Sequence, residues 1–167
     1  MRLFGRAPEL PAEVRAAVRG RPLASAEADG GTWLVGTRDA LFLIGPDGVT
    51  LPWEQVLRAD WDQDSSTLTV ERVEEYGRPT TSWSFVLAEP GGLVPLLRER
   101  VSASVLLQRR IPIEKKRGLT LIARRPPAGG AVTWAYQLDP GMDPADPVVA
   151  AAAEAALHDA QESLGLL

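Results

Sequence analysis

The sequence predicts an α+β fold: a small antiparallel β-barrel or sandwich of about seven strands, closed by an amphipathic helix, with a C-terminal β-hairpin and helix appended. Three observations predict this fold. Up to residue 87, short segments rich in β-branched and aromatic residues alternate with turn signals. At Gly91 the hydrophobic spacing changes to a helical period. The 167 residues, 45% of them hydrophobic and 24% charged, suit one compact domain.

The first predicted element is a short helix. Leu10, Val14 and Val18 recur on one helical face, Pro11 can occupy the first turn, and Gly20 can end the helix. We therefore assign residues 1–20 to an N-terminal helix.

Seven strands are predicted next, over residues 23–28, 32–37, 40–44, 48–51, 56–62, 67–73 and 81–87. The turn signals between them include Asp29-Gly30-Gly31, Pro46-Asp47-Gly48 and Asp64-Ser65-Ser66. Such connections are too short for a parallel crossover, which needs a dozen or more residues. We therefore expect consecutive antiparallel hairpins.

A helix is predicted to close this sheet. Leu93, Leu97, Val101 and Val105 recur at helical spacing, and Pro95 falls in the first turn, where proline is tolerated. We expect residues 21–107 to form one unit.

The remaining residues, 108–167, are predicted to form an extension of two strands and a helix that packs on the same unit. The strands are expected at 118–123 and 131–138, and the helix after Asp146-Pro147, which can serve as its cap and first position. The apolar stripe of this helix is mostly alanine and buries little apolar area. Its members are Val149, Ala153, Ala156, Ala160 and Leu164.

Two stretches carry a family resemblance. Between Trp33 and Leu43 an apolar strand runs through the turn Thr37-Arg38-Asp39 into a second apolar strand, and residues 51–56, LPWEQV, read as the end of a later strand. Over about residues 21–107 the chain resembles the bacterial branch of the pleckstrin-homology-like (PH-like) domain family. The resemblance implies a binding or scaffolding module.

The sequence lacks the basic residues with which some members of this family bind lipid headgroups. Family members that hold inositol phosphates carry basic residues around the first hairpin, whereas here that turn is Ala28-Asp29-Gly30-Gly31. Many eukaryotic members also place a tryptophan in the closing helix, and residues 91–108 contain none.

Composition excludes some chemistry. Without cysteine the chain forms no disulfide and no thiolate metal site. The N-terminus has no apolar run of signal-peptide length, and no run is long enough to cross a membrane, so we expect a cytoplasmic protein.

The net charge of -4 is unevenly distributed. The chain after Arg125 holds six acidic residues and no lysine or arginine, so the first 125 residues hold 18 basic and 22 - 6 = 16 acidic residues, a balance of +2. The densest basic run is the candidate binding patch: Arg109, Arg110, Lys115, Lys116, Arg117, Arg124 and Arg125. It could bind phosphate, nucleic acid or an acidic protein surface, or the acidic tail could fold back onto it. The negative net charge favours the tail.

The stretch from Asp60 to Glu71 resembles a calcium loop. Asp60, Asp62, Asp64 and Glu71 match positions 1, 3, 5 and 12 of the EF-hand pattern. However, Ser65 replaces the required glycine, and both flanks alternate with the period of a strand. We therefore predict a turn between two strands, and no metal site.

No pattern in the sequence indicates a catalytic centre or a cofactor. The only histidine, His158, is expected to form a surface pair with Glu154. We predict a non-enzymatic protein-interaction or scaffolding module with an unidentified protein partner. A homodimer through exposed strand edges or the last helix is open, and neither nucleic acid nor a membrane is the expected partner. Two alternatives stand: a divalent-metal-dependent enzyme or regulator using Asp60 to Glu71, or a binder of anionic surfaces through Arg109 to Arg125.

Overall fold

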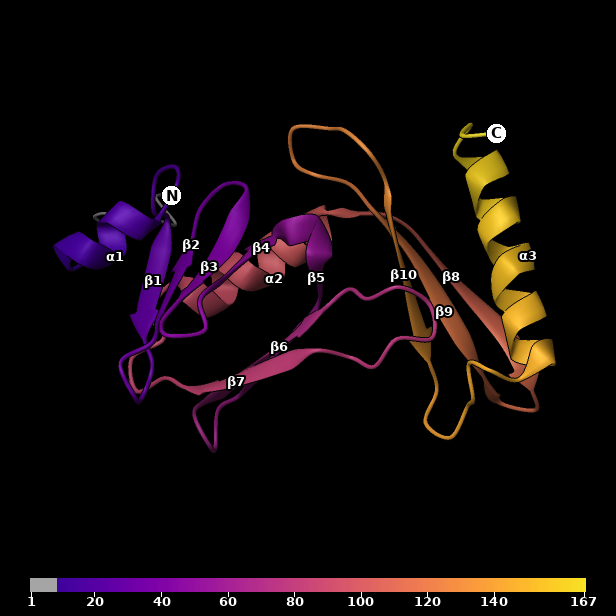
Figure 1. Ribbon diagram of the computed structural model, residues 1–167, viewed down its shortest axis with the longest axis horizontal. Helices are drawn as coiled ribbons and strands as arrows, with labels where there is room; N and C mark the ends of the chain where they lie inside the picture. The colour runs from indigo at the N-terminus through magenta and orange to yellow at the C-terminus, as the bar shows by residue number, and fades with distance from the viewer. Residues whose placement is uncertain (1–8) are drawn as a thin grey trace.

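The computed structural model describes residues 9–167 (Figure 1). Within this range the chain forms three antiparallel sheets, three α-helices and one short 3-10 helix. The predicted α+β class is therefore confirmed. None of the helices in the described range combines the length and apolar character that crossing a membrane requires.

The first two sheets contain the seven predicted strands. The first sheet has the order β1 (Ala24–Glu27), β2 (Trp33–Gly36), β3 (Ala40–Ile44) and β4 (Val49–Pro52). After the 3-10 helix η1 (Trp53–Gln55), the second sheet has the order β5 (Val56–Asp62), β6 (Thr67–Arg72) and β7 (Ser82–Val86). Strand order follows chain order in both, as expected for consecutive hairpins.

The predicted barrel does not close. Closure would need ladders between β4 and β5 and between β7 and β1, and neither pair is hydrogen-bonded into a sheet. The chain leaves strand conformation at Pro52, which lacks an N–H group, and passes through η1 before β5 begins. At the other corner the Asp29 N–H donates to the Val86 carbonyl at 3.0 Å. The two sheets are therefore separate and enclose a shared core.

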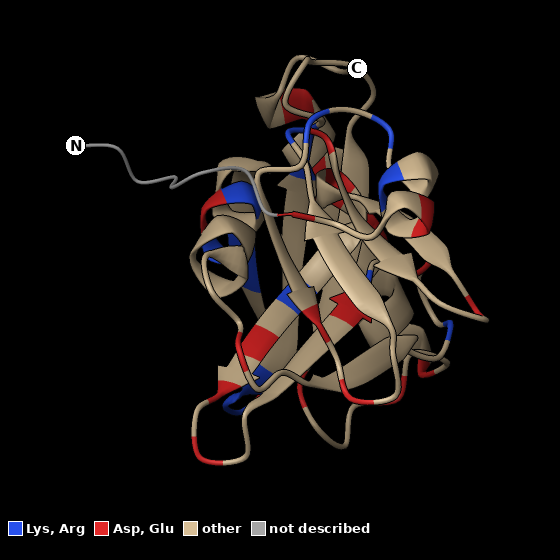
Figure 2. Cartoon of the chain, turned by 90° about the vertical axis from the view of Figure 1, so that its left-hand side faces the viewer, with Lys and Arg blue, Asp and Glu red and all other residues tan. Residues whose placement is uncertain are grey.

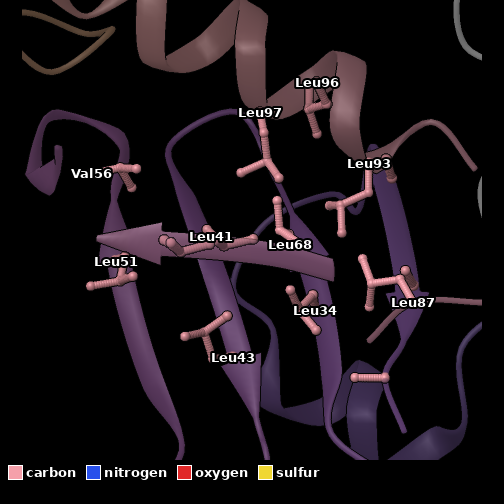
Figure 3. Close-up of a cluster of buried hydrophobic side chains, with 14 of the residues drawn as sticks. Leu34, Leu41, Leu43, Leu51, Val56, Leu68, Leu87, Leu93, Leu96 and Leu97 are labelled. Carbon is pink, nitrogen blue, oxygen red and sulfur yellow. The ribbon is translucent and has the colours of Figure 1, made fainter. Parts of the chain in front are cut away.

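Helix α2 (Leu93–Ala103) covers one end of this core and contacts β1, β2, η1 and β5. Figure 3 shows its leucines pointing between the strands, toward side chains of both sheets. The largest fully buried side chains of this cluster are Leu34, Leu41, Leu51, Trp53, Leu68, Leu87, Leu93, Leu96 and Leu97. Burying one leucine side chain contributes about 1.5 to 3 kcal/mol, so this cluster dominates the stability of the two sheets.

The two stretches that carry the family resemblance meet in this core. The Trp53 Nε1–H donates to the Thr37 carbonyl at 3.0 Å, and the Trp53 ring is fully buried. The Thr37 hydroxyl accepts from the Asp39 and Ala40 N–H groups at 3.3 Å each, which fixes the turn between β2 and β3. Gly36 leaves room for neighbouring side chains in this core. A Cβ at this position would come within 2.5 Å of Leu96 Cδ2 and within 3.5 Å of the Trp53 ring.

Helix α1 (Ala12–Ala17) lies on the outer face of the first sheet. Val14 and Val18 pack against Val35 and Phe42. The leading helix predicted within residues 1–20 is thus confirmed from Ala12, and residues 1–8 of that prediction lie outside the described range.

A third sheet follows α2, with the order β10 (Thr133–Leu138), β9 (Arg117–Arg124) and β8 (Val105–Glu114). Helix α3 (Pro147–Ser163) packs on its far face, against Leu119 and Leu121 (Figure 1). We call β1 to β7 with α2 the two-sheet unit, and β8 to β10 with α3 the C-terminal layer.

Strand β8 is the element that the sequence analysis did not predict. The helix predicted to continue to Val105 ends at Ala103, and the chain then enters ten residues of strand. The third sheet thus begins inside the range assigned above to residues 21–107. The predicted strands at 118–123 and 131–138 and the helix after Asp146-Pro147 are confirmed as β9, β10 and α3.

Candidate functional site

The predicted basic patch does not form one surface, because Arg124 is buried with only 3% of its surface exposed. Its guanidinium donates to the Val101 carbonyl at 3.0 Å, the Ser104 hydroxyl at 2.8 Å and the Leu57 carbonyl at 2.9 Å. Burial lowers the pKa of Arg124, yet an arginine keeps its charge at neutral pH. The carbonyl at the C-terminal end of α2 stabilises that charge. Arg124 therefore ties β9 to α2 and β5, and is not available to a ligand.

The exposed arginines of the patch have partners within the chain. Arg110 forms a two-pronged ion pair with Asp139, and Arg117 pairs with Glu114 at 2.8 Å. Arg109 donates to the Ser163 hydroxyl at 3.2 Å. Lys115 and Lys116 form the exposed turn between β8 and β9. In the view of Figure 2, acidic and basic positions are interspersed, and neither kind gathers into one continuous surface.

Asp139 is the residue through which the acidic tail returns to the basic patch. Besides Arg110, its carboxylate accepts the Gly118 N–H at 3.0 Å. The hydrogen bonds from Arg110 and Gly118 lower the pKa of Asp139 to about 2. The predicted contact between tail and patch is thus made at this one carboxylate, at the end of β10.

The acidic stretch from Asp60 to Glu71 forms a hairpin. Asp60 and Asp62 lie on β5, Asp64 in the turn and Glu71 on β6. Asp62 accepts the Asp64 N–H at 3.0 Å and the Ser65 hydroxyl at 2.8 Å, and these bonds lower its pKa.

The carboxylates of this stretch do not converge. Asp60 pairs with Arg58 at 2.7 Å instead. Across residues 9–167, no three histidine, aspartate or glutamate side chains come together in a way that could hold a metal ion. The turn predicted at Asp64-Ser65-Ser66 is present, with Ser66 at a positive φ of 51°.

His158 lies exposed on α3, and its pairing differs from the prediction. Its Nε2 is 3.9 Å from Glu162 Oε1, one turn after it, whereas Glu154 is not its partner. Both side chains are about two-thirds exposed, so this contact contributes little.

A cleft of about 480 Å³ lies where the C-terminal layer meets the two-sheet unit. One wall comes from β5, β6 and the 74–80 segment, and the other from β9, β10 and the 138–144 segment. Arg124 ties β9 to β5 through the Leu57 carbonyl, and Thr120 and Gln137, which lie further along β9 and β10, line the cleft. Clefts between structural units are where ligand sites most often occur.

Ion pairs line the first wall of the cleft. Arg72 donates to Glu74 at 2.8 Å, Arg78 lies 4.0 Å from Glu75, and Arg58 lies 3.7 Å from Glu71. The hydrogen bonds from Thr81 and Arg72 lower the pKa of Glu74. With Asp139 on the opposite wall, the cleft holds three cationic and four anionic side chains. The cleft therefore presents positive and negative groups together, and neither sign of charge dominates its surface.

Two tyrosines join the walls. The rings of Tyr76 and Tyr136 pack edge to face with centroids 5.2 Å apart, and the Tyr76 hydroxyl donates to the Pro144 carbonyl at 2.9 Å. Burial raises the pKa of both phenols, and Asp143 and Asp146 raise that of Tyr76 further. Both hydroxyls therefore stay protonated at neutral pH and are unsuited to act as a base.

The lining residues include no serine, cysteine, lysine or histidine. Four carboxylates and two threonines are among them. They offer hydrogen bonds, ion pairs and two aromatic rings.

Sequence analysis did not find this cleft. Its walls come from segments about sixty residues apart, and no motif marks them. The available signal was the pairing of charges in Glu71, Arg72, Glu74, Glu75 and Arg78, which lie where β6 ends.

Comparison of the chain with protein-family models, with curated proteins and with solved structures finds no match in any of the three.

Proposed function

We propose that the protein is a non-enzymatic protein-interaction module of PH-like architecture, and that a segment of its partner binds in the cleft between the two-sheet unit and the C-terminal layer. The order of seven antiparallel strands and one helix supports the PH-like assignment. We propose a cytoplasmic location for the protein, as the sequence predicts.

The observation that carries the proposal is the composition of the cleft. Its first wall alternates carboxylates with arginines, and each of the three arginines already has a carboxylate close by. A partner segment that bears both signs of charge can exchange these solvent-accessible pairs for intermolecular ones at little cost, because ion pairs in contact with water are weak. The tyrosine pair adds a rigid aromatic contact of the kind enriched at protein interfaces.

Site-specific photo-crosslinking in the organism that encodes the chain tests the proposal. A photoreactive amino acid at Gln137, inside the cleft, should capture a protein that the same group at Gln63, in the distant turn after β5, does not capture. Charge reversal of Arg78, which lines the cleft and is exposed, should remove the Gln137 product.

The matched control is Arg98→Glu, since Arg98 is an exposed arginine on α2 that does not line the cleft. This variant should leave the crosslink unchanged. Equal capture from both positions, no capture from Gln137, or equal loss in both charge reversals would contradict the proposal.

A further inference from the structure

The outer edge of the second sheet is formed by β7, which pairs only with β6. The Arg72 N–H donates to the Thr81 carbonyl and the Leu87 N–H to the Ser66 carbonyl, both at 2.9 Å. Backbone groups alternate in direction along a strand, so those of Trp83 also face β6, and those of Ser82 and Ser84 face away from the sheet.

The other sheet edges are protected against pairing. On β5 and β1, charged side chains occupy the edge strand, among them Asp60 and Glu27. On β4 the strand ends in Pro52. The edge of β10 lies beside the segment that carries Tyr76, which packs on Tyr136.

The edge of β8 carries Pro112 and flanking charges. The Gly118 carbonyl accepts the Asp139 N–H, so the backbone of Gly118 faces β10 and that of Leu119 faces β8. In the register Ile111 opposite Leu119, the nitrogen of Pro112 then points to the free edge, where its missing N–H interrupts any further ladder.

Strand β7 has none of these features. From Thr80 to Ala88 the chain contains no charge, no proline and no glycine, and its residues favour strands. Ser82 and Ser84 are exposed, and Trp83 and Phe85 are only partly covered by the core. The Val86 carbonyl accepts the Asp29 N–H at one end of this edge, and within residues 9–167 the outward backbone groups of Ser82 and Ser84 have no backbone partner. An uncharged edge of this kind is a template for another strand.

We propose that β7 pairs antiparallel with β7 of a second copy of this chain, about a two-fold axis beside Trp83. In this register Ser82 lies opposite Ser84 of the second copy, and the N–H and carbonyl groups of these two serines satisfy one another. The Val86 carbonyl stays with Asp29, as in the single chain. Trp83 lies opposite its own symmetry mate at a non-hydrogen-bonded position, where facing side chains come closest.

Charge at the two ends of β7 supports a second copy in the antiparallel direction. Asp29 and Glu89 lie near the Val86 end, and Arg78 precedes the other end. Antiparallel pairing brings Arg78 of one chain toward Glu89 of the other, whereas parallel pairing would place like charges together. The product is one continuous sheet of six strands with isologous symmetry.

The first test is the mass of the full chain by analytical ultracentrifugation over a concentration series. A short strand pair lies at the small end of stable interfaces, so we expect a reversible shift from monomer to dimer as concentration rises. Ser84→Lys should abolish the shift, because it places two cations beside the axis. Its control, Gln108→Lys, adds the same charge to the β8 edge and should dimerise like the parent.

The second test uses the absence of cysteine from the chain. A single cysteine in Trp83→Cys would face itself across the axis, within the Cα separation that a disulfide allows, and should form a disulfide-linked dimer on mild oxidation. Thr69→Cys, one strand inward on β6, should stay monomeric. Circular dichroism confirms that each variant is folded.

A chain that stays monomeric at every concentration would overturn this proposal, as would a dimer that survives Ser84→Lys or equal crosslinking through both cysteines. The proposal does not depend on the cleft, since Gln137 lies on a different surface from Ser82 and Ser84, and Ser84→Lys changes no residue that lines the cleft.

Discussion

At the residue scale, three positions that follow α2 make contacts that depend on the residue present there. Gly118 lies where β8 bulges against β9, and a Cβ there would come within 2.0 Å of the Ile111 carbonyl oxygen. Asp139 accepts both from Arg110 and from the Gly118 N–H. Arg124 supplies hydrogen bonds in three directions from a buried position. Each one can be tested by a single substitution.

The pKa of Asp139 should respond to Arg110. In the parent chain its carboxyl should titrate at about 2, and Arg110→Met should raise that pKa toward its usual range, because the first cause of the depression is the hydrogen bond from Arg110. Carboxyl-detected NMR during an acid titration measures both values.

Because the pKa of Asp139 is lower in the folded state than in the unfolded state, the ionised carboxylate stabilises the fold. The stabilisation from ionised Asp139 is complete above the unfolded pKa, about 4, and is lost as the pH falls toward 2. The difference in unfolding free energy between parent and Arg110→Met should therefore shrink over this range. A pKa of Asp139 that does not move in Arg110→Met would contradict the assignment.

Gly118→Ala should destabilise the fold by about 2 to 3 kcal/mol, because the new methyl group collides with rigid backbone and not with a flexible side chain. Urea unfolding followed by tryptophan fluorescence measures the change.

Gly92→Ala is the matched control for Gly118→Ala. Gly92 has an ordinary φ of -83°, and its Cβ would meet Ala24 Cβ at 3.8 Å, a normal contact. As the N-cap of α2 it should cost about 1 kcal/mol or less. Equal losses in the two variants would show that the close contact at Ile111 is not what Gly118 relieves.

At the scale of elements, local signals in the sequence predicted where most strands and helices lie. The turn residues around Gly30, Asp47 and Ser65 separate strands as expected, since their conformations depend on the turn residues themselves. Helix α3 begins where Asp146-Pro147 predicts, because cap and first residue act within one turn.

Strand β8 could not be predicted by the same means. Val105 continues the helical spacing of Leu93, Leu97 and Val101, so the pattern favours a longer helix. Pro112 argues against a strand unless its nitrogen faces an open edge, and only the tertiary pairing with β9 reveals that edge. The local pattern was overridden by pairing with residues that follow later in the chain.

Asp146→Ala should destabilise α3 by about 1 kcal/mol, because the Asp146 carboxylate accepts the Val148 N–H at 2.8 Å and no other cap replaces it. Thermal unfolding measured by circular dichroism provides the readout. Asp159→Ala, an exposed position inside the same helix, should be neutral or stabilising, since alanine has the higher helix propensity. The cap has no role if both variants behave alike.

At the scale of the whole molecule, Arg124 joins the two-sheet unit to the C-terminal layer. It reaches from β9 to the Leu57 carbonyl on β5 and to Val101 and Ser104 at the end of α2. The sequence places Arg124 in a basic run and gives no sign of burial, because that burial depends on how two separately formed sheets pack. The cleft was hidden for the same reason, while its charged residues were visible.

Arg124→Met keeps most of the side-chain volume but removes three hydrogen bonds; the Val101 carbonyl keeps its bond from the Ser104 hydroxyl, whereas the Leu57 carbonyl loses its bond from Arg124. We expect a loss of about 3 kcal/mol, at about 1 kcal/mol for each hydrogen bond, and a loosening of the C-terminal layer. Tryptophan fluorescence and far-ultraviolet circular dichroism should give one coincident unfolding transition in the parent chain.

Arg117, the exposed first residue of β9, provides the comparison. Arg117→Met removes only the pair with Glu114, in which both side chains are about half exposed, and should cost less than about 1 kcal/mol. Similar losses for Arg124 and Arg117 would mean that the buried guanidinium does not hold the units together.

Every sheet in this protein pairs strands in the order in which the chain supplies them. During synthesis on the ribosome, each hairpin can therefore form as soon as its second strand has emerged, without waiting for distant sequence. The Leu57 carbonyl and the end of α2 are the exception, because their donor arrives only with residue 124. A nascent chain that has emerged only as far as β8 should accordingly hold two completed sheets. The surface formed by Leu57 and the end of α2 would still be uncovered, and chaperones or proteases could reach it.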